Sequence, residues 1–458
     1  MSSEPASPAA EPEPEPEPDA TQPSARGTIG RGSALLFAGQ LIGNAGFFVA
    51  VLILARSLGP SGRGAMAFIT VTALVVARVM KVGISQAVTL FAAQRPQQRA
   101  VLLSNLLVYS IAGSLAGAAV VCGALLALPG IRPASVGPTE IGILLAGTVA
   151  TSLWDESFLL GCGRMRGLSM RIAIGGWVYA LVIALTGLAV GLRVATAAAA
   201  WAISQALVGL VFQAGPLRRH GLARPNLRLL GEMLHLGARA WIGTLSTLLN
   251  ARFDQILMAF IATQAALGIY AVAVNVSEVL LYVPSAIAAA MLPAISTGDR
   301  TIASERALRI IRASMLIGFA TMLVAAVFGP VVIPFVFGEP FQPSVAPFLW
   351  LLPGVIGYSA VSVTNSALLV AGSPGRSSVG PLVCLVAGVA MDLALIPPFG
   401  ASGAAAAATA AFTAGGITGI FLYRGRVHFG WRELTPGLED VRDAWSFTTG
   451  LMRRGRTA

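Results

Sequence analysis

Charged residues are scarce in this chain. Asp, Glu, Lys and Arg make up 11% of its 458 residues, whereas soluble proteins carry about 25%. Hydrophobic residues make up 55%, and long apolar runs recur between residues 33 and 424. About 20 such residues suffice for a helix to cross the hydrocarbon core of a bilayer. The composition therefore excludes an ordinary soluble enzyme and predicts an all-α, polytopic membrane protein.

The residues that build metal sites and disulfide frameworks are also rare. The chain has three Cys and three His, and their spacing matches no metal motif. Its sequence shows no Gly-rich phosphate cradle, no zinc-protease motif and no long loop between spans. We therefore expect no metal, no cofactor and no enzymatic activity, and neither a membrane-embedded enzyme nor a scaffold has support.

The first 30 residues lack the apolar core of a signal peptide. They are rich in Pro and Glu, with six acidic residues and no basic residue before Arg26. This composition predicts a disordered acidic tail over residues 1–30. The formal net charge is nevertheless +11. In a membrane protein the orientation of the spans accounts for most of that excess, so we expect no nucleic-acid partner.

Segments rich in Gly and Pro divide the apolar part of the chain into about twelve predicted transmembrane helices. The predicted spans are 33–55, 65–92, 101–128, 139–161, 172–191, 195–215, 231–258, 266–293, 308–336, 344–371, 376–397 and 401–423.

Arginine is unevenly distributed between the connections of these spans. One alternate set, which includes both tails, holds most of the basic residues, whereas the other holds only Arg56, Arg63, Arg132 and Arg193. Because basic residues mark the cytoplasmic side, we expect a multi-pass protein of the cell (plasma or inner) membrane with both termini in the cytoplasm.

The most basic internal connection divides the chain into two halves. It spans residues 216–230 and separates an N-lobe over 31–215, with helices 1–6, from a C-lobe over 231–424, with helices 7–12. A cytoplasmic tail over 425–458 follows. The similarity of "GRGAMAFITVTALVV" to "ALGIYAVAVNVSEVL", the second span of each half, favours two pseudo-symmetric lobes around a central cavity.

Four basic residues lie inside predicted spans. They are Arg78, Lys81, Arg239 and Arg252, and Lys81 is the only lysine in the chain. A charge at mid-bilayer depth costs roughly 2.5–3.5 kcal/mol on insertion scales. Arg78 lies about 20 Å below the start of its span, and a spacing of three places Lys81 on the same helical face. We expect all four to line the cavity and to bind an anionic substrate.

The alternative is that these basic residues only neutralise other charges. Arg78 and Lys81 would then pair with acids such as Asp155 or Glu278. Arg239 and Arg252 would instead extend toward the membrane surfaces.

Acidic residues also lie inside the spans. Glu278 is the deepest, and a buried carboxylate can take up a proton. Glu278 and Asp254 are therefore candidates for proton or cation coupling, with charge pairing as the alternative for each. Asp155 and Glu156 lie nearer the cytoplasm, and we expect a structural role for them. Asp392 is a further intramembrane acid.

Several segments, in order, resemble one family. "LARSLGPSGRGAMAFI" resembles the turn between the first two helices of the polysaccharide (lipid-linked oligosaccharide) flippases, which belong to the multidrug/oligosaccharidyl-lipid/polysaccharide exporter superfamily. "LNARFDQILMAFIATQAALGIYAVAVNVSEVL" is similar to that family's seventh and eighth helices. "VIPFVFGEPFQPSVAPFLWLLPGVI", "LLVAGSPGR" and "LALIPPFGASGAAAAAT" resemble its later connections. The resemblance covers roughly residues 30–425.

The resemblance implies a two-lobed transporter that alternates access. Its substrate would be an oligosaccharide on undecaprenyl pyrophosphate, moved from the inner to the outer leaflet for cell-surface polysaccharide synthesis. We expect a monomer, in contact with membrane lipid and with a polysaccharide polymerase or chain-length machinery. The alternative is a multidrug or small-metabolite cation antiporter of the same superfamily. Acids at the cavity centre would favour the antiporter, whereas bases at mid-depth favour the flippase.

Overall fold

The chain folds into helices. The computed structural model describes residues 25–128, 130, 132–295, 300–371, 373–427, 429, 430 and 433, and every regular element among them is helical. This confirms the all-α prediction. In chain order the elements are α1 (Ala25–Met80), α2 (Ile84–Gln94), η1 (Pro96–Gln98), α3 (Arg99–Ala127), α4 (Pro138–Ser152), α5 (Ser157–Gly161), α6 (Met165–Val190), α7 (Val194–His220), α8 (Leu227–Ile261), α9 (Gln264–Ile295), α10 (Arg300–Phe337), η3 (Glu339–Ser344), α11 (Val345–Val370), α12 (Pro374–Ser377) and α13 (Val379–Val427).

The length and apolarity of the helices make the protein a multi-pass membrane protein. Within the described residues, nine helical segments are long and apolar enough to cross a bilayer. Two of them, Leu35–Met80 and Gly375–Val427, have 46 and 53 residues, far more than one crossing needs. Each is interrupted by a glycine with positive φ, Gly59 in α1 and Gly400 in α13. The count of twelve helices stays a prediction.

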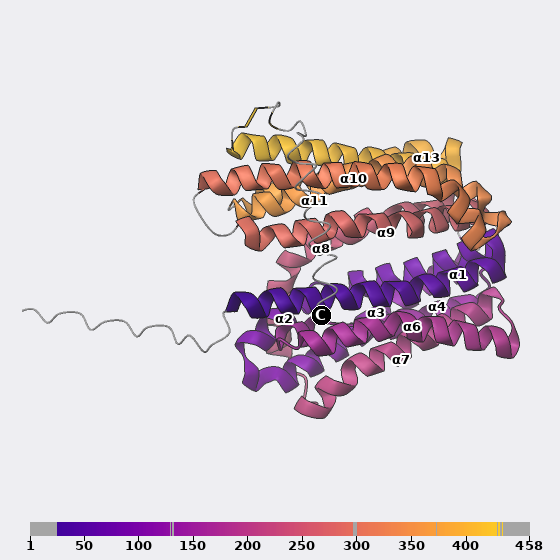
Figure 1. Cartoon of the computed structure of the whole chain (residues 1–458). Helices are drawn as coiled ribbons and strands as arrows, with labels where there is room; N and C mark the ends of the chain where they lie inside the picture. Colours follow the sequence, from indigo (N-terminus) through magenta and orange to yellow (C-terminus); the bar gives the residue numbers. More distant parts are fainter. Residues whose placement is uncertain are drawn as a thin grey trace, which may run out of the picture.

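The helices run roughly parallel in two groups (Figure 1). The first group contains α1 to α7 and the second contains α9 to α13, while α8 packs against both α2 and α13. Only residues 221–226 separate α7 from α8, so most of the predicted connection 216–230 is helical. The predicted tails 1–30 and 425–458 lie largely outside the described residues.

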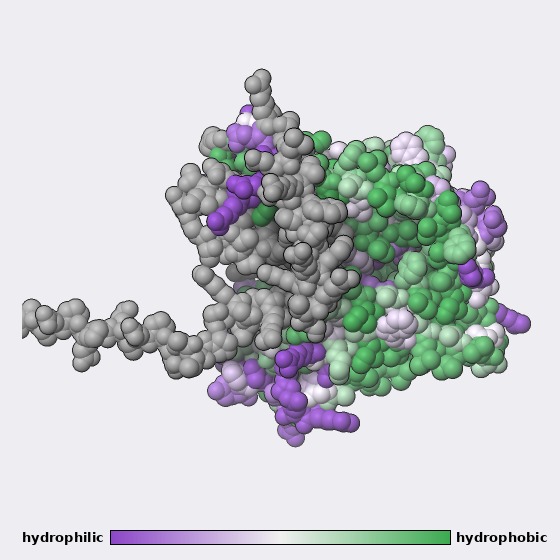
Figure 2. Space-filling view, in the orientation of Figure 1, coloured by the Kyte–Doolittle hydropathy of each residue, from purple (hydrophilic) through white to green (hydrophobic). Residues whose placement is uncertain are grey.

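The outer surface is apolar around the middle of the molecule (Figure 2). Large side chains point outward from several helices, with Leu188 86% and Phe335 80% exposed, whereas hydrophilic residues gather toward the ends of the bundle on the face shown in Figure 2. An exposed apolar surface of this kind would cause aggregation in water. It is therefore the surface that faces lipid.

The helix predicted over residues 65–92 is not continuous. Helix α1 ends at Met80, α2 begins at Ile84, and Val82 and Gly83 both have positive φ. At the break the backbone of Gly83 lies directly against that of Gly237 in α8, an approach that leaves no room for a Cβ atom. The face that Arg78 and Lys81 were predicted to share is therefore lost: Arg78 is exposed, whereas Lys81 lies in the break and is buried.

Candidate functional site

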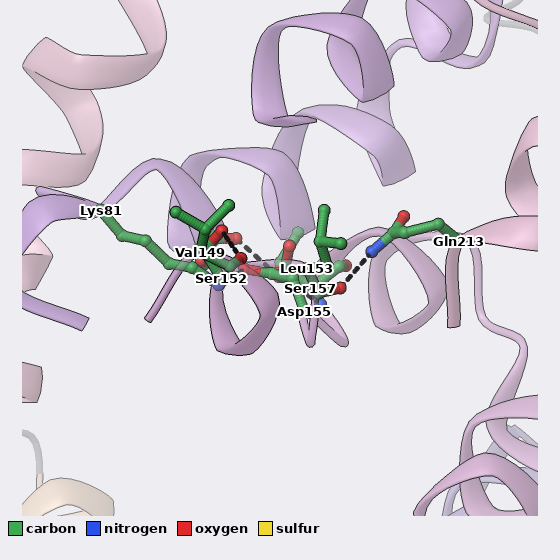
Figure 3. Close-up of polar contacts among 9 residues, drawn as sticks. Lys81, Val149, Ser152, Leu153, Asp155, Ser157 and Gln213 are labelled. Atoms are coloured by element: carbon green, nitrogen blue, oxygen red, sulfur yellow. Dashed lines mark hydrogen bonds and ion pairs between the residues drawn. The ribbon is translucent and has the colours of Figure 1, made fainter. Parts of the chain in front are cut away.

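Lys81 forms a buried ion pair inside the first group of helices. Its Nζ lies 2.6 Å from Oδ2 of Asp155, and both side chains are 4% exposed. The Ser85 hydroxyl donates to the same carboxylate oxygen at 2.6 Å, and the backbone N–H of Ser157 donates to Oδ1 at 2.9 Å. Figure 3 shows Lys81 extending from its own segment toward the loop that carries Asp155.

The ion pair places the counter-charge of Lys81 inside the protein. Both oxygens of Asp155 are engaged, and its partner is the ammonium group that was predicted to meet the substrate. A buried pair of this kind stays stable only when both charges are present. The structure thus contains the pairing with Asp155 that was the alternative for Lys81, and binding of the substrate by Lys81 stays a prediction.

Arg78 differs from its neighbour. It is exposed, and among the described residues no carboxylate lies within 4 Å of its guanidinium. Glu156 is close enough to Arg78 to interact with it electrostatically, but it forms no ion pair with the guanidinium. Arg239 lies in the middle part of α8, but its side chain lies outside the described part of the chain.

Two charged residues near the end of α8, Arg252 and Asp254, bind different partners on α9. Nη1 of Arg252 lies 2.6 Å from Oε1 of Glu278, with the side chains 24% and 30% exposed. The Tyr270 hydroxyl donates a short hydrogen bond to Asp254, and the backbone N–H of Gln255 donates to the same carboxylate at 2.6 Å. Arg252 and Glu278 therefore largely neutralise each other, whereas Asp254 has no cationic partner within ion-pair distance among the described residues.

A small cavity joins Asp254 to an acid on a distant helix. The cavity is about 30 Å³ in volume, and Asn250 and Asp254 of α8 and Asp392 of α13 are among its lining residues. Oδ1 of Asp392 is buried and has no hydrogen-bond partner within the described structure. A volume of this size holds about one water molecule or a small ion. Sequence reasoning named Asp254 but could not pair it with Asp392, because only the fold brings α8 and α13 together.

Helix α8, which leads into the second helix group, meets the first group closely at the end of the bundle that contains α2. A Cβ atom on Gly237 would overlap the carbonyl oxygen of Gly83, and the reverse is also true. Nearby, Nη1 of Arg95 lies 3.1 Å from Oε2 of Glu232. We call the pairing of Gly83 with Gly237 the inner contact, because the arginine distribution predicts this end to be cytoplasmic.

A second close approach lies at the opposite end. A Cβ atom on Gly268 of α9 would overlap the carbonyl oxygen of Pro60, and one on Gly64 would overlap that of Gln264. Arg56 reinforces this end by donating to the carbonyl oxygen of Val336 at 2.7 Å. We call this set, centred on Gly268, the outer contact. Both contacts are closed in this structure.

A family model described as "Polysaccharide biosynthesis protein" matches residues 53–346, well over half of the chain. The chain belongs to this family. Family membership confirms the resemblance drawn from the sequence motifs. No curated protein sequence matches the chain.

Solved structures of transporters share the fold. A multidrug resistance MATE family transporter of the MOP superfamily, in an inward-facing conformation, matches with a TM-score of 0.66 at 17% identity over 84% of this chain and 94% of that one. The lipid II flippase MurJ, in an inward closed conformation, matches with a TM-score of 0.67 at 12% identity over 92% of each chain. A MOP superfamily transporter from Pyrococcus furiosus matches with a TM-score of 0.56 at 15% identity over 88% and 95%. At these identities the likeness shows a common fold.

The Lys81–Asp155 pair leads to a stability prediction. Asp155→Asn leaves a buried ammonium without its counter-charge, which costs about 3–5 kcal/mol, so we expect a clear fall in melting temperature in detergent. In Lys81→Met/Asp155→Leu both charges are gone, and we expect most of the lost stability to return.

The exposed Arg95–Glu232 pair provides the matched control. Arg95→Gln removes one partner of a pair worth less than about 1 kcal/mol, so its melting temperature should stay close to that of the wild type. Equal losses in Asp155→Asn and Arg95→Gln would contradict the structural role of the buried pair.

Proposed function

We propose that the protein is a transporter that moves an oligosaccharide linked to a lipid pyrophosphate from the cytoplasmic to the outer leaflet, for synthesis of a cell-surface polysaccharide. The observation that carries this proposal is the match to a polysaccharide biosynthesis family over a chain with a transporter fold. Residence in the inner membrane, cytoplasmic termini, a monomeric state and a partner polymerase or chain-length machinery belong to the same proposal.

Arg78 supports an anionic cargo. A guanidinium binds phosphate oxygens through two parallel N–H donors, and Arg78 is an exposed arginine in the last turn of α1 with no carboxylate within 4 Å among the described residues. Outward movement of a charge of −2 through a potential of 100 mV, negative inside, releases about 4.6 kcal/mol. The membrane potential therefore favours export of a pyrophosphate.

The cavity between Asp254 and Asp392 supports binding of a cation, because two acids line it. A multidrug or small-metabolite cation antiporter, the alternative function, would bind its cargo at such a place. A cavity of about 30 Å³ is too small for an organic cation, however, and fits a proton carrier or a small ion. We therefore assign Asp254 to ion coupling, and prefer it to Glu278, which is paired with Arg252.

The first test concerns Arg78. In proteoliposomes that contain an undecaprenyl pyrophosphate-linked oligosaccharide, we expect Arg78→Gln to slow translocation about tenfold or more, because a hydrogen bond to a charged group is lost. The control is Arg193→Gln, an exposed arginine at the opposite end of the bundle, which should translocate at the wild-type rate.

If Arg78→Gln and Arg193→Gln translocate equally fast, Arg78 does not bind the pyrophosphate. If the wild type moves no lipid-linked oligosaccharide but exchanges an organic cation for protons or sodium, the antiporter is correct instead.

The inner and outer contacts generate the second test. Alternating access requires one contact to open while the other stays closed. Gly237→Ala introduces a Cβ that overlaps the backbone of Gly83, so it should favour a state open at the inner end. Gly268→Ala should favour a state open at the outer end in the same way.

Spin labels report the two ends separately. One pair of labels, at Gln98 and Arg309, spans the inner end between the two helix groups, and the other, at Arg193 and Glu339, spans the outer end; all four residues are exposed. We expect Gly237→Ala to lengthen only the inner distance and Gly268→Ala only the outer distance. Identical distance distributions in both variants would argue against gating at these glycines.

The third test concerns coupling. We expect the transport rate of the wild type to respond to an imposed proton or sodium gradient, and Asp254→Asn to lose that response while transport driven by potential alone persists. Arg252→Gln/Glu278→Gln, which removes a neutral ion pair, is the control and should retain the response. Loss of the response in the control alone would move the coupling site to Glu278.

A further inference from the structure

An arginine-lined cavity lies in the first helix group, away from both contacts between the groups. Its volume is about 660 Å³. We call it the arginine pocket, after Arg164, Arg166, Arg171 and Arg219. These residues belong to the α5–α6 turn, the start of α6 and the end of α7, at the end of the bundle that the arginine distribution predicts to be cytoplasmic.

The backbone, rather than an acid, holds the central arginine of the pocket in place. Arg171 is partly buried and donates from Nη1 to the carbonyl oxygen of Phe212 at 2.5 Å. Its guanidinium also lies directly against Gly215, where any Cβ atom would overlap Nη2. Arg171 is therefore fixed against α7 while most of its N–H donors stay available.

The positive charge of the pocket is not neutralised by the described protein. Among the described residues, none of its four arginines lies within 4 Å of a carboxylate. Arg164 and Arg219 are close enough to repel Arg171 electrostatically, and His220 also lines the cavity. Like charges gathered beside a low-dielectric membrane core are stabilised by a bound anion.

The walls of the pocket indicate what kind of anion fits. Leu35, Phe158 and Met165 line it beside the arginines. The outward faces of the adjoining helices are strongly apolar, with Met170 of α6 63% and Leu210 of α7 60% exposed. A ligand with an anionic head and apolar chains satisfies both surfaces, because its head meets the guanidinium groups and its chains lie along α6 and α7.

We propose that the arginine pocket binds the headgroup phosphate of an anionic phospholipid from the predicted cytoplasmic leaflet. The pocket is lined by α1, α5, α6 and α7 and the α5–α6 turn alone. The phospholipid therefore binds within one helix group and is not carried through the contacts between the groups. The proposal is independent of the cargo that the transporter moves.

The test measures binding of phosphatidylglycerol to the full chain in detergent, by native mass spectrometry and by melting temperature. We expect phosphatidylglycerol, but not phosphatidylcholine, to stay bound to the wild type and to raise its melting temperature. In Arg166→Gln/Arg219→Gln, two exposed pocket residues are neutralised, and the affinity should fall by about fivefold per arginine. Arg171→Gln should weaken binding as well.

Arg218→Gln/Arg224→Gln is the matched control. It removes the same charge from exposed residues of the same region that do not line the pocket, and its affinity for phosphatidylglycerol should match that of the wild type. Equal weakening in the control and the pocket variant would overturn the proposal, since it would show attraction to general surface charge. So would displacement of the lipid by millimolar inorganic phosphate, which would make the pocket a site for free phosphate.

Discussion

Hydrocarbon offers no hydrogen-bond partners, so each polar group within a span has to find its partner inside the protein. The helical backbone meets this requirement along the chain, and the charged side chains meet it through specific pairs. Lys81 is neutralised by Asp155, and Arg252 by Glu278. Against this background the few groups that stay without such partners stand out. Arg63 and Asp392 are the informative ones: each is buried and has a polar atom without a hydrogen-bond partner in the described structure, and a charge kept at such cost in a membrane protein is usually functional.

A second constraint concerns how the two helix groups hold together. Between helices in lipid the hydrophobic effect contributes little, so close packing of small residues takes its place. The glycines at the inner and outer contacts bring backbones together without intervening side chains. Contacts of this kind separate without unpacking large side chains. They therefore suit surfaces that open and close repeatedly, and their position at opposite ends matches alternating access.

Much of the fold could be predicted from composition and pattern. Apolar runs of membrane-spanning length and breakers between them correctly indicated an all-α membrane protein, and the motif around Gly59 indicated its family. The break at residues 81–83 could not be predicted from local sequence, and it lies where the backbone meets Gly237, more than 150 positions later in the chain. The shared face of Arg78 and Lys81 was inferred from helical spacing, and it fails at that break. The proximity of Asp254 to Asp392 could not be predicted either, because α8 and α13 are far apart in the sequence and meet only in the fold.

The fold keeps an exposed cationic group, Arg78, apart from the acidic cavity lined by Asp254 and Asp392. If Arg78 and the acids of the small cavity were neighbours, they would pair as Lys81 and Asp155 do, and neither would be available to a ligand. The fold instead places the cationic group in the first helix group and the acidic cavity between α8 and α13. Under the proposed function, an anion at Arg78 and a cation in the acidic cavity would not compete for one site. In the function that we propose, movement of the two groups relative to each other at the glycine contacts would couple the two occupancies mechanically rather than by direct contact.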